Sequence, residues 1–181
     1  MKNYFLKLFF LMSVFVFAQA CNNPETTNKI NPLDTISQLD VNKKLINSNT
    51  MFAVQERDEI KQYIEHHHYD MKVTASGIYY MFYKKGNGAL AKVGETALVK
   101  FKISLLDGTL CYSSDTEGLK SFLIGEDQVE TGLHEAIQLM HVGDKALFII
   151  PSFLAAGMVG DKEKIPPKAT VVYEIELVSL K

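Results

Sequence analysis

Apolar and polar residues alternate through most of the second half of the chain, as they do in β-strands that bury one face. In the longest such stretch, Ala97, Val99, Phe101 and Ile103 share one side, and the lysines between them fall on the other. Successive side chains of a strand point to opposite faces of a sheet, so this stretch predicts a half-buried strand. Apolar runs predict further strands at residues 78–83, 121–124, 146–150 and 171–180.

Two other regions repeat their apolar residues at the helical period instead. Residues 37–69 carry apolar stripes at Leu39, Leu45, Ile46 and Phe52, and then at Ile60, Tyr63 and Ile64. The polar run 47–50 predicts a break that divides this region into two helices. A short third helix is predicted after Thr131, a candidate N-cap, with Leu133, Ile137 and Met140 on one face.

The order of these elements is several strands, one helix and two more strands, which predicts an α+β fold. We expect an antiparallel sheet wrapped around one short helix and preceded by an N-terminal helical segment. The polar stretch before that segment is typical of a flexible tether. The predicted organisation is a signal peptide at 1–20, a tether at 21–36, a helical lead at 37–70 and a folded domain at 71–181.

The first twenty residues have the pattern of an export signal. Lys2 and Lys7 flank the start of an apolar run, and the small-x-small sequence Ala18-Gln19-Ala20 follows it. The next residue, Cys21, resembles the lipidated cysteine of bacterial lipoproteins, although Ala18 stands where most such sites carry leucine. Lipidation of Cys21 is the favoured reading and would anchor the chain to a membrane. Ordinary secretion with a free N-terminal cysteine is the alternative.

Charge and composition exclude several classes of function. Removal of residues 1–20 leaves 17 basic and 21 acidic residues, a formal charge of −4, so nothing favours nucleic acid as a partner. Arg57 is the sole arginine, which argues against phosphate clamps. We expect a location in the cell envelope, with the outer membrane favoured because Asn22 does not resemble an inner-membrane retention signal.

Histidine and cysteine residues do not form a predicted metal site. The run His66-His67-His68 lies in a helical region, where consecutive side chains diverge by about 100° and cannot converge on one ion. His134 and His141 have no ligand partners at metal spacing. If Cys21 is acylated, Cys111 is the only remaining thiol, and we expect it to be a small buried residue rather than a reactive one.

A series of short motifs then follows one known order. They are Val93-Gly94, Leu106-Asp107-Gly108, Ser113-Ser114, Ile124-Gly125, Val129-x-x-Gly132-Leu133, Met140-x-Val142-Gly143, Pro151-Ser152, Gly157, Ile165-Pro166-Pro167 and Val172-x-x-x-Glu176-Leu177. In this order they resemble the FKBP-type peptidyl-prolyl isomerases. With the signal peptide, Cys21 and the helical lead, the chain looks most like the gliding-motility-associated lipoproteins of that family.

The resemblance implies an enzyme that twists the amide bond before proline in exported proteins. Without a catalyst, that bond interconverts between its cis and trans forms in tens to hundreds of seconds. An apolar pocket favours the less polar twisted state, so no nucleophile, metal or cofactor is needed. The resemblance also implies that the Ile165-Pro166-Pro167 loop forms one wall of the proline pocket.

The resemblance implies nine pocket positions, of which Val129 and Ile165 match the family. At three positions this chain differs from the usual family residue: Phe101 replaces a tyrosine, Tyr173 replaces a phenylalanine and Leu133 replaces a tryptophan. The remaining positions are Cys111 for a phenylalanine, Tyr112 for an aspartate that faces the ligand, Glu130 for an isoleucine whose backbone N–H binds the ligand, and Ala156 for a tyrosine. We expect a larger pocket with fewer groups that can hydrogen-bond a ligand.

Three hypotheses remain open. The first is an envelope isomerase acting on proline-containing clients, which the Ile-Pro-Pro loop favours. The second is a chaperone or binding module with little turnover, which the changes at Cys111, Tyr112, Leu133 and Ala156 favour. The third adds a homodimer formed through residues 37–70. An ordinary core role is equally compatible with the sequence at Phe101, Leu133 and Tyr173. We expect Lys84-Lys85 and the run 161–164 to be solvated loops.

Overall fold

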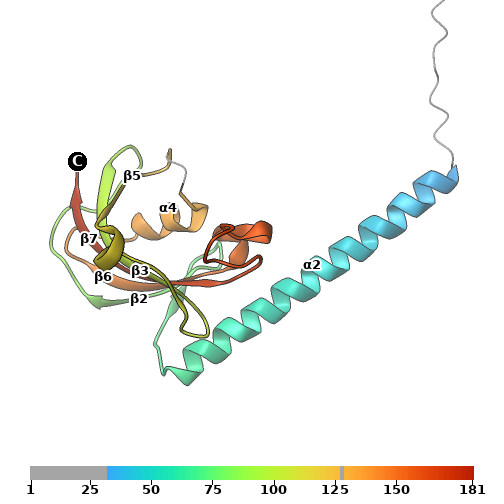
Figure 1. Ribbon diagram of the computed structural model, residues 1–181, viewed down its shortest axis with the longest axis horizontal. Helices are drawn as coiled ribbons and strands as arrows, with labels where there is room; N and C mark the ends of the chain where they lie inside the picture. Colours follow the sequence, from blue (N-terminus) through green and yellow to red (C-terminus); the bar gives the residue numbers. More distant parts are fainter. Residues whose placement is uncertain (1–31, 127–128) are drawn as a thin grey trace, which may run out of the picture. The chain divides into compact units, whose positions relative to one another are not determined.

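An antiparallel sheet forms the body of the domain (Figure 1). The computed structural model describes residues 32–126 and 129–181, so the predicted signal peptide, Cys21 and most of the tether lie outside the described residues. Within them, the strands follow the spatial order β1-β2-β6-β7-β3-β4, and β5 also pairs with β3. The strands are β1 (Lys72–Val73), β2 (Tyr79–Lys84), β3 (Thr96–Leu105), β4 (Leu110–Ser113), β5 (Lys120–Leu123), β6 (Lys145–Ile150) and β7 (Val171–Leu180).

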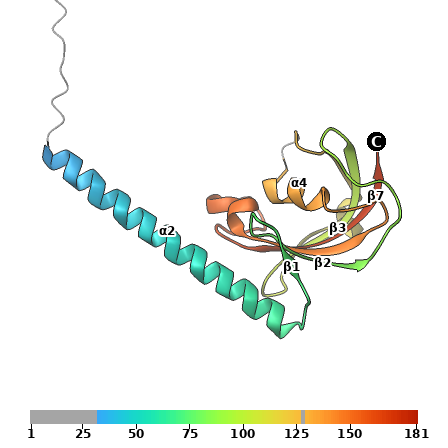
Figure 2. The same ribbon diagram turned by 180° about the vertical axis from the view of Figure 1, so that it is seen from behind.

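Short helices accompany the sheet. The helix α4 (Thr131–Ile137) lies against one face of it, as the two opposite views show (Figure 1, Figure 2). It buries Leu133 and Ile137 in the same core cluster as Phe101, Phe148 and Tyr173. The predicted α+β fold, with one short helix on an antiparallel sheet, is therefore confirmed. The other short helices are α3 (Ser114–Glu117), η1 (Ser152–Leu154) and η2 (Gly157–Val159).

The central strand β6 is buried on both faces. In β6, Ala146, Phe148 and Ile150 join the cluster around α4, whereas Leu147 and Ile149 join a second cluster on the opposite face. A strand covered on both sides carries a continuous apolar run instead of an alternating one. This explains why residues 146–150 are all apolar, whereas β3 alternates between buried and more exposed positions.

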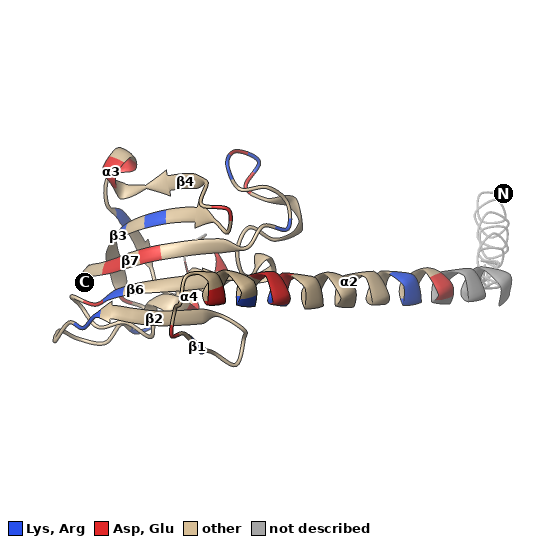
Figure 3. Cartoon of the chain, turned by 90° about the horizontal axis from the view of Figure 1, so that it is seen from below, with Lys and Arg blue, Asp and Glu red and all other residues tan. Residues whose placement is uncertain are grey.

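Outside the region covered by α2, the back face of the sheet is charged. Lys100 and Lys102 of β3 lie opposite Glu176 and Glu174 of β7 in the strand register (Figure 3). Lys145 of β6 also pairs with Glu176 at 2.8 Å. The ammonium groups of Lys100 and Lys102 form their ion pairs with Asp115 of α3, at 3.2 and 3.9 Å. The Lys145–Glu176 pair joins β6 to β7, and such a cross-strand pair contributes roughly 0.2–1 kcal/mol.

The helical lead is one helix, α2 (Pro32–His66), which covers the second apolar cluster. Its residue Ile60 is 1% exposed and packs with Leu147, Ile149 and Val172. The predicted break at 47–50 is wrong, and residues 32–36, which we assigned to the tether, are helical. Polar residues cost a helix only about 0.5 kcal/mol each, and the Thr50 hydroxyl donates to the Ile46 carbonyl within the helix at 2.8 Å.

The stretch of α2 from residue 40 to 51 is exposed throughout, including Leu45, Ile46 and Met51. Pairing of two copies through this stretch stays a prediction, which sedimentation at several concentrations would test. In the part of the chain that the structure describes, no helix is both long and apolar enough to span a membrane.

Some local details differ from the predictions. The N-cap of α4 is Glu130, and Thr131 is the first helical residue. Strand β4 and helix α3 were not predicted, and neither shows a clear apolar period over its four residues.

A buried carboxylate ties α2 to the domain. Glu56 is 5% exposed, and its Oε1 accepts from the Ser152 backbone N–H at 2.6 Å and from the Thr170 hydroxyl at 2.7 Å. Ser152 begins η1 and Thr170 precedes β7, so one side chain holds both ends of the segment 152–170.

Replacement of Glu56 by alanine should therefore destabilise the domain. The change leaves a buried N–H and a buried hydroxyl without their charged acceptor, so we expect the free energy of unfolding in urea to fall by about 2–4 kcal/mol. The matched control is Glu59, which lies one turn further along α2 and is exposed. Glu59→Ala should change the free energy of unfolding by less than about 0.5 kcal/mol. Equal losses in the two variants would contradict this role.

Candidate functional site: an apolar cavity with acidic walls

A cavity of about 370 Å³ lies on the face of the sheet that carries α4. Phe101 and Ile103 of β3, Leu119 and Ile165 supply apolar wall. Polar side chains complete the lining, and they are Tyr112, Glu117, Lys120, Glu130 and Asp161. The combination of apolar walls with a few convergent polar groups is typical of a site for a small ligand or a short peptide segment.

An irregularity in the strand pairing shapes one side of this cavity. Ile103 pairs with Tyr112, but the next pair is Ser104 with Leu110, so Cys111 is an extra residue in β4. An extra residue makes a β-bulge, which redirects neighbouring side chains. Both Cys111 and Tyr112 consequently reach the loop 161–165: the Cys111 thiol lies 3.5 Å from the Lys164 carbonyl, and the Tyr112 hydroxyl donates to Asp161.

Asp161 organises that loop. Its Oδ1 accepts from three backbone N–H groups, those of Glu163 at 2.8 Å, Lys164 at 3.0 Å and Ile165 at 2.8 Å. The preceding Gly160 has a φ of 66°, and a Cβ there would come within 2.2 Å of the Ile165 carbonyl oxygen. Glycine followed by aspartate therefore closes the loop and sets Ile165, which is 4% exposed, into the cavity wall.

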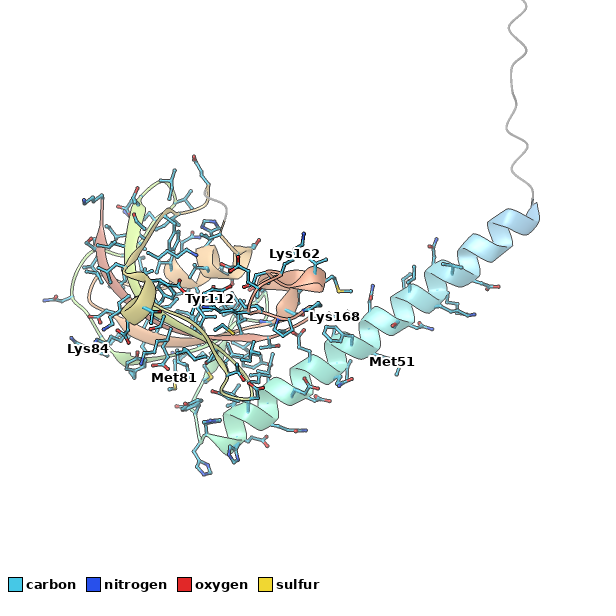
Figure 4. All side chains as sticks on the ribbon, in the orientation of Figure 1. Met51, Met81, Lys84, Tyr112, Lys162 and Lys168 are labelled. Atoms are coloured by element: carbon cyan, nitrogen blue, oxygen red, sulfur yellow. The ribbon has the colours of Figure 1, made fainter. Side chains whose placement is uncertain are left out.

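The hydrogen bond between Tyr112 and Asp161 joins the two sides of the cavity. Tyr112 lies beside the loop that carries Lys162 (Figure 4). Acceptance by Asp161, together with partial burial, raises the pKa of the Tyr112 hydroxyl, which therefore stays protonated. Burial works to raise the pKa of Asp161, but the Tyr112 hydroxyl and the three backbone donors outweigh it and lower that pKa. The loop is thus held by a charged acceptor at neutral pH.

Two further polar groups lie beneath this wall. Glu130 precedes α4 and lines the cavity, and Tyr173 of β7 pairs in register with the cavity residue Ile103. Burial raises the pKa of the Tyr173 hydroxyl well above its usual range, and the charge of the nearby Glu130 carboxylate and a hydrogen bond with it add to the effect. The Tyr173 hydroxyl is therefore a neutral group beside a carboxylate.

The structure brings four of the nine predicted pocket residues into the cavity lining, and these are Phe101, Tyr112, Glu130 and Ile165. Cys111, Leu133 and Tyr173 are buried in the core cluster that adjoins it, and Val129 and Ala156 pack against the same cluster. Burial raises the pKa of the Cys111 thiol, with smaller contributions from Asp161 and Asp107, which fits the expected inert residue. The binding roles of all nine stay predictions.

The sequence interpretation missed Asp161. We expected residues 161–164 to be a solvated loop, but Asp161 is half-buried and accepts from four donors. The available signal was the sequence Gly-Asp, since an aspartate side chain often bonds the backbone two residues further on. The family resemblance implies a carboxylate at position 112, and here a carboxylate from the facing loop bonds the Tyr112 hydroxyl instead.

Comparisons with known proteins agree with this geometry. A family model described as FKBP-type peptidyl-prolyl cis-trans isomerase matches residues 88–178. The probable FKBP-type isomerase FkpA of Neisseria meningitidis is 36% identical over 110 residues, and FkpA of Escherichia coli K12 is 33% identical over 112 residues. Each alignment covers 61% of this chain and 40% of the relative, so the chain spans about two fifths of the length of these relatives.

Solved structures show the same fold. The crystal structure of FkpA from Escherichia coli superposes with a TM-score of 0.60 at 26% identity, over 84% of this chain and 74% of that one. The crystal structure of AtFKBP13 gives a TM-score of 0.59 at 26% identity, over 62% of this chain and 99% of the other.

Asp161 should control the order of the cavity wall. We expect Asp161→Ala to speed hydrogen exchange of the Ile165 amide by about tenfold or more, because its charged acceptor is lost. Asp161→Asn should have a smaller effect, since an amide oxygen still accepts N–H bonds. The pKa of Asp161 is lower in the folded protein than in the unfolded chain. The contribution of Asp161 to the hydrogen-exchange protection factor of the Ile165 amide should therefore be constant above about pH 4 and be lost as the pH falls further.

Glu163→Ala is the matched control, because Glu163 is exposed and its side chain lies at a marginal 3.4 Å from the Tyr112 hydroxyl. Equal exchange of the Ile165 amide in Asp161→Ala and in the unchanged protein would show that the loop is held by other contacts.

Proposed function

Because this chain belongs to the FKBP-type peptidyl-prolyl cis-trans isomerase family, we propose that its cavity binds proline-containing segments and accelerates their cis–trans exchange. The observation that carries this proposal is the apolar wall of Phe101, Ile103 and Ile165 around a cavity of about 370 Å³. That volume lies in the range of small-ligand sites and accommodates a proline ring with part of its neighbours.

The mechanism requires little from the protein. A planar X-Pro amide is stabilised by resonance, and its charge separation is reduced when the bond twists. Walls that exclude water favour the twisted state over the planar one, which is selective binding of the transition state. Ile165 lines the cavity from one loop, and Phe101 lines it from the sheet. The Asp161–Tyr112 hydrogen bond holds these two sides in place before substrate binds.

A binding module with little turnover is the second candidate. The observation that favours it is the Glu130 carboxylate in the cavity lining, where the family resemblance implies isoleucine. A charge beside the reacting amide makes the environment more polar, which weakens the preference for the twisted state. Such a protein would hold proline segments of its clients without speeding their exchange.

We further propose that the protein works in the cell envelope as a lipoprotein attached through Cys21, facing the periplasm or the surface at the outer membrane. The signal-like run and the cysteine that follows it support this proposal. The closer likeness to gliding-motility-associated lipoproteins belongs to the same proposal. Its clients would be proline-containing proteins that cross or reside in the envelope.

Isomerase activity is tested with a panel of X-Pro peptides in a protease-free assay. We expect the purified full chain to accelerate exchange, and Ile165→Ala to lower kcat/KM by about tenfold, because the cavity loses one apolar wall. Leu90→Ala, at an exposed position outside the cavity, serves as the control and should leave kcat/KM unchanged. No acceleration for any peptide, from a folded protein that still binds them, would favour the binding module.

Lipid attachment is tested by growing expressing cells with a clickable fatty acid. The mature protein should carry the label and partition into detergent, whereas Cys21→Ala should carry none. A wild-type chain that is cleaved but unlabelled would support the alternative of ordinary secretion.

A further inference from the structure

Three large apolar side chains are exposed close together in the chain. Phe153 of η1 is 64% exposed, and Met158 and Val159 of η2 are 59% and 65% exposed. Residues 153–160 also contain no charged side chain. Single exposed apolar residues are common on protein surfaces, whereas a cluster of them indicates a surface that binds a partner. Phe153, Met158 and Val159 are called the apolar patch below.

The apolar patch belongs to a well-packed part of the fold. The helices η1 and η2 contact each other, and η1 also contacts α4 (Figure 1, Figure 2). The Lys168 backbone N–H donates to the Gly157 carbonyl at 2.9 Å and so ties η2 to the start of β7. The residues of this segment that pack against the core are Leu154, Ala155 and Ala156. The three patch residues are thus left outside by a segment whose other apolar residues already supply its packing.

The apolar patch is continuous with the cavity. Val159 lies two residues before Asp161, which lines the cavity, so their Cα atoms are at most about 7 Å apart. The Asp161 backbone N–H donates to the carbonyl of Ile165, another lining residue, at 3.1 Å. Helix η2 therefore leads directly into the loop that forms the cavity wall.

Resting on the proposed isomerase or binding function, we propose that the apolar patch binds an apolar side chain of the client, three or four residues from the proline that occupies the cavity. An extended chain rises about 3.3 Å per residue, so such a side chain lies about 10–13 Å from the proline and reaches past the cavity wall. The absence of charge among residues 153–160 favours a neutral apolar segment over a charged one.

The chemistry of the patch also fixes its kinetic effect. Methionine is flexible and polarisable, so Met158 adapts to client side chains of different shape. The patch is remote from the reacting amide, and its contacts are the same in the planar and twisted states. Such uniform binding lowers KM without raising kcat.

Matched peptides test this role. The full chain is assayed with a short X-Pro peptide and with versions lengthened by four residues before or after the proline. One lengthened version has leucine at the third and fourth positions from the proline, and the other has asparagine, a polar near-isostere, at the same positions. We expect leucine on at least one side to lower KM about fivefold relative to asparagine, with kcat within twofold. Equal KM values on both sides overturn the proposal.

Variants locate the effect. Met158→Ser and Val159→Ser should each bring the ratio of the asparagine KM to the leucine KM towards one. The ratio compares two peptides on the same variant, so a partial loss of folded protein does not change it. Val73→Ser is the control, because Val73 is a 57% exposed valine in β1, outside both the patch and the cavity lining. An equal loss in Val73→Ser overturns the specific role of the patch.

Two other occupants of the patch would give different results. If a second copy of the chain covers it, the protein sediments as a dimer that Val159→Ser dissociates. If a lipid surface covers it, phosphatidylglycerol vesicles bind the protein and not the Val159→Ser variant. Either result, without an effect of the leucine residues on KM, overturns the client proposal.

Failure of this inference can be told apart from failure of the proposed function. If the short peptide is accelerated and leucine gives no advantage, the isomerase stands and the role of the patch falls. If no peptide is accelerated, the same panel is measured by fluorescence anisotropy. Tighter binding of the leucine peptide, lost in Val159→Ser, then supports the patch in a binding module, and equal binding of the leucine and asparagine peptides, or none, overturns it.

Discussion

The carboxylate of Asp161 is the contact on which the geometry of the cavity depends. It accepts from three consecutive backbone N–H groups and from the Tyr112 hydroxyl, and so fixes a tight loop to a strand on the other side of the cavity. The Asp161 backbone N–H also donates to the Ile165 carbonyl at 3.1 Å, and Lys164 contacts Cys111 and Glu117, but the Asp161 side chain accepts most of the hydrogen bonds of the loop. A charged acceptor with several short donors makes the wall rigid before any client arrives.

The same segment is held from behind by the helix α2. Glu56 bonds Ser152 and Thr170, the two ends of the stretch that contains Asp161 and Ile165. The helix therefore takes part in positioning the cavity, although it packs on the opposite face of β6 and β7 from α4. Strand β6, which is buried on both faces, can transmit this restraint because a close-packed interior passes strain between its residues.

The sequence predicts the sheet well, because the pattern of apolar residues follows burial, and it predicts the loops poorly, because their contacts do not leave such a pattern. Alternation along β3 and the apolar run of β6 follow directly from which faces are buried, and the family motifs fix their order. The predicted break in α2 failed because polar residues cost a helix little, and Thr50 bonds the Ile46 carbonyl within the helix at that place. Asp161 was missed because its partners come from the backbone of its own loop and from β4, which residue types alone do not reveal.

Glu130 and Tyr173 distinguish a specialised cavity from a degenerate one. A cavity that had only lost family contacts would end with smaller apolar groups, as at Leu133 and Ala156. The Tyr173 hydroxyl is instead buried against the Glu130 carboxylate, so a polar pair stands where the family resemblance implies phenylalanine and isoleucine. A polar contact in a low-dielectric interior restricts how the residues around it can pack. The changes at these two positions therefore add a specific contact next to the cavity, and they differ from a simple loss of apolar surface.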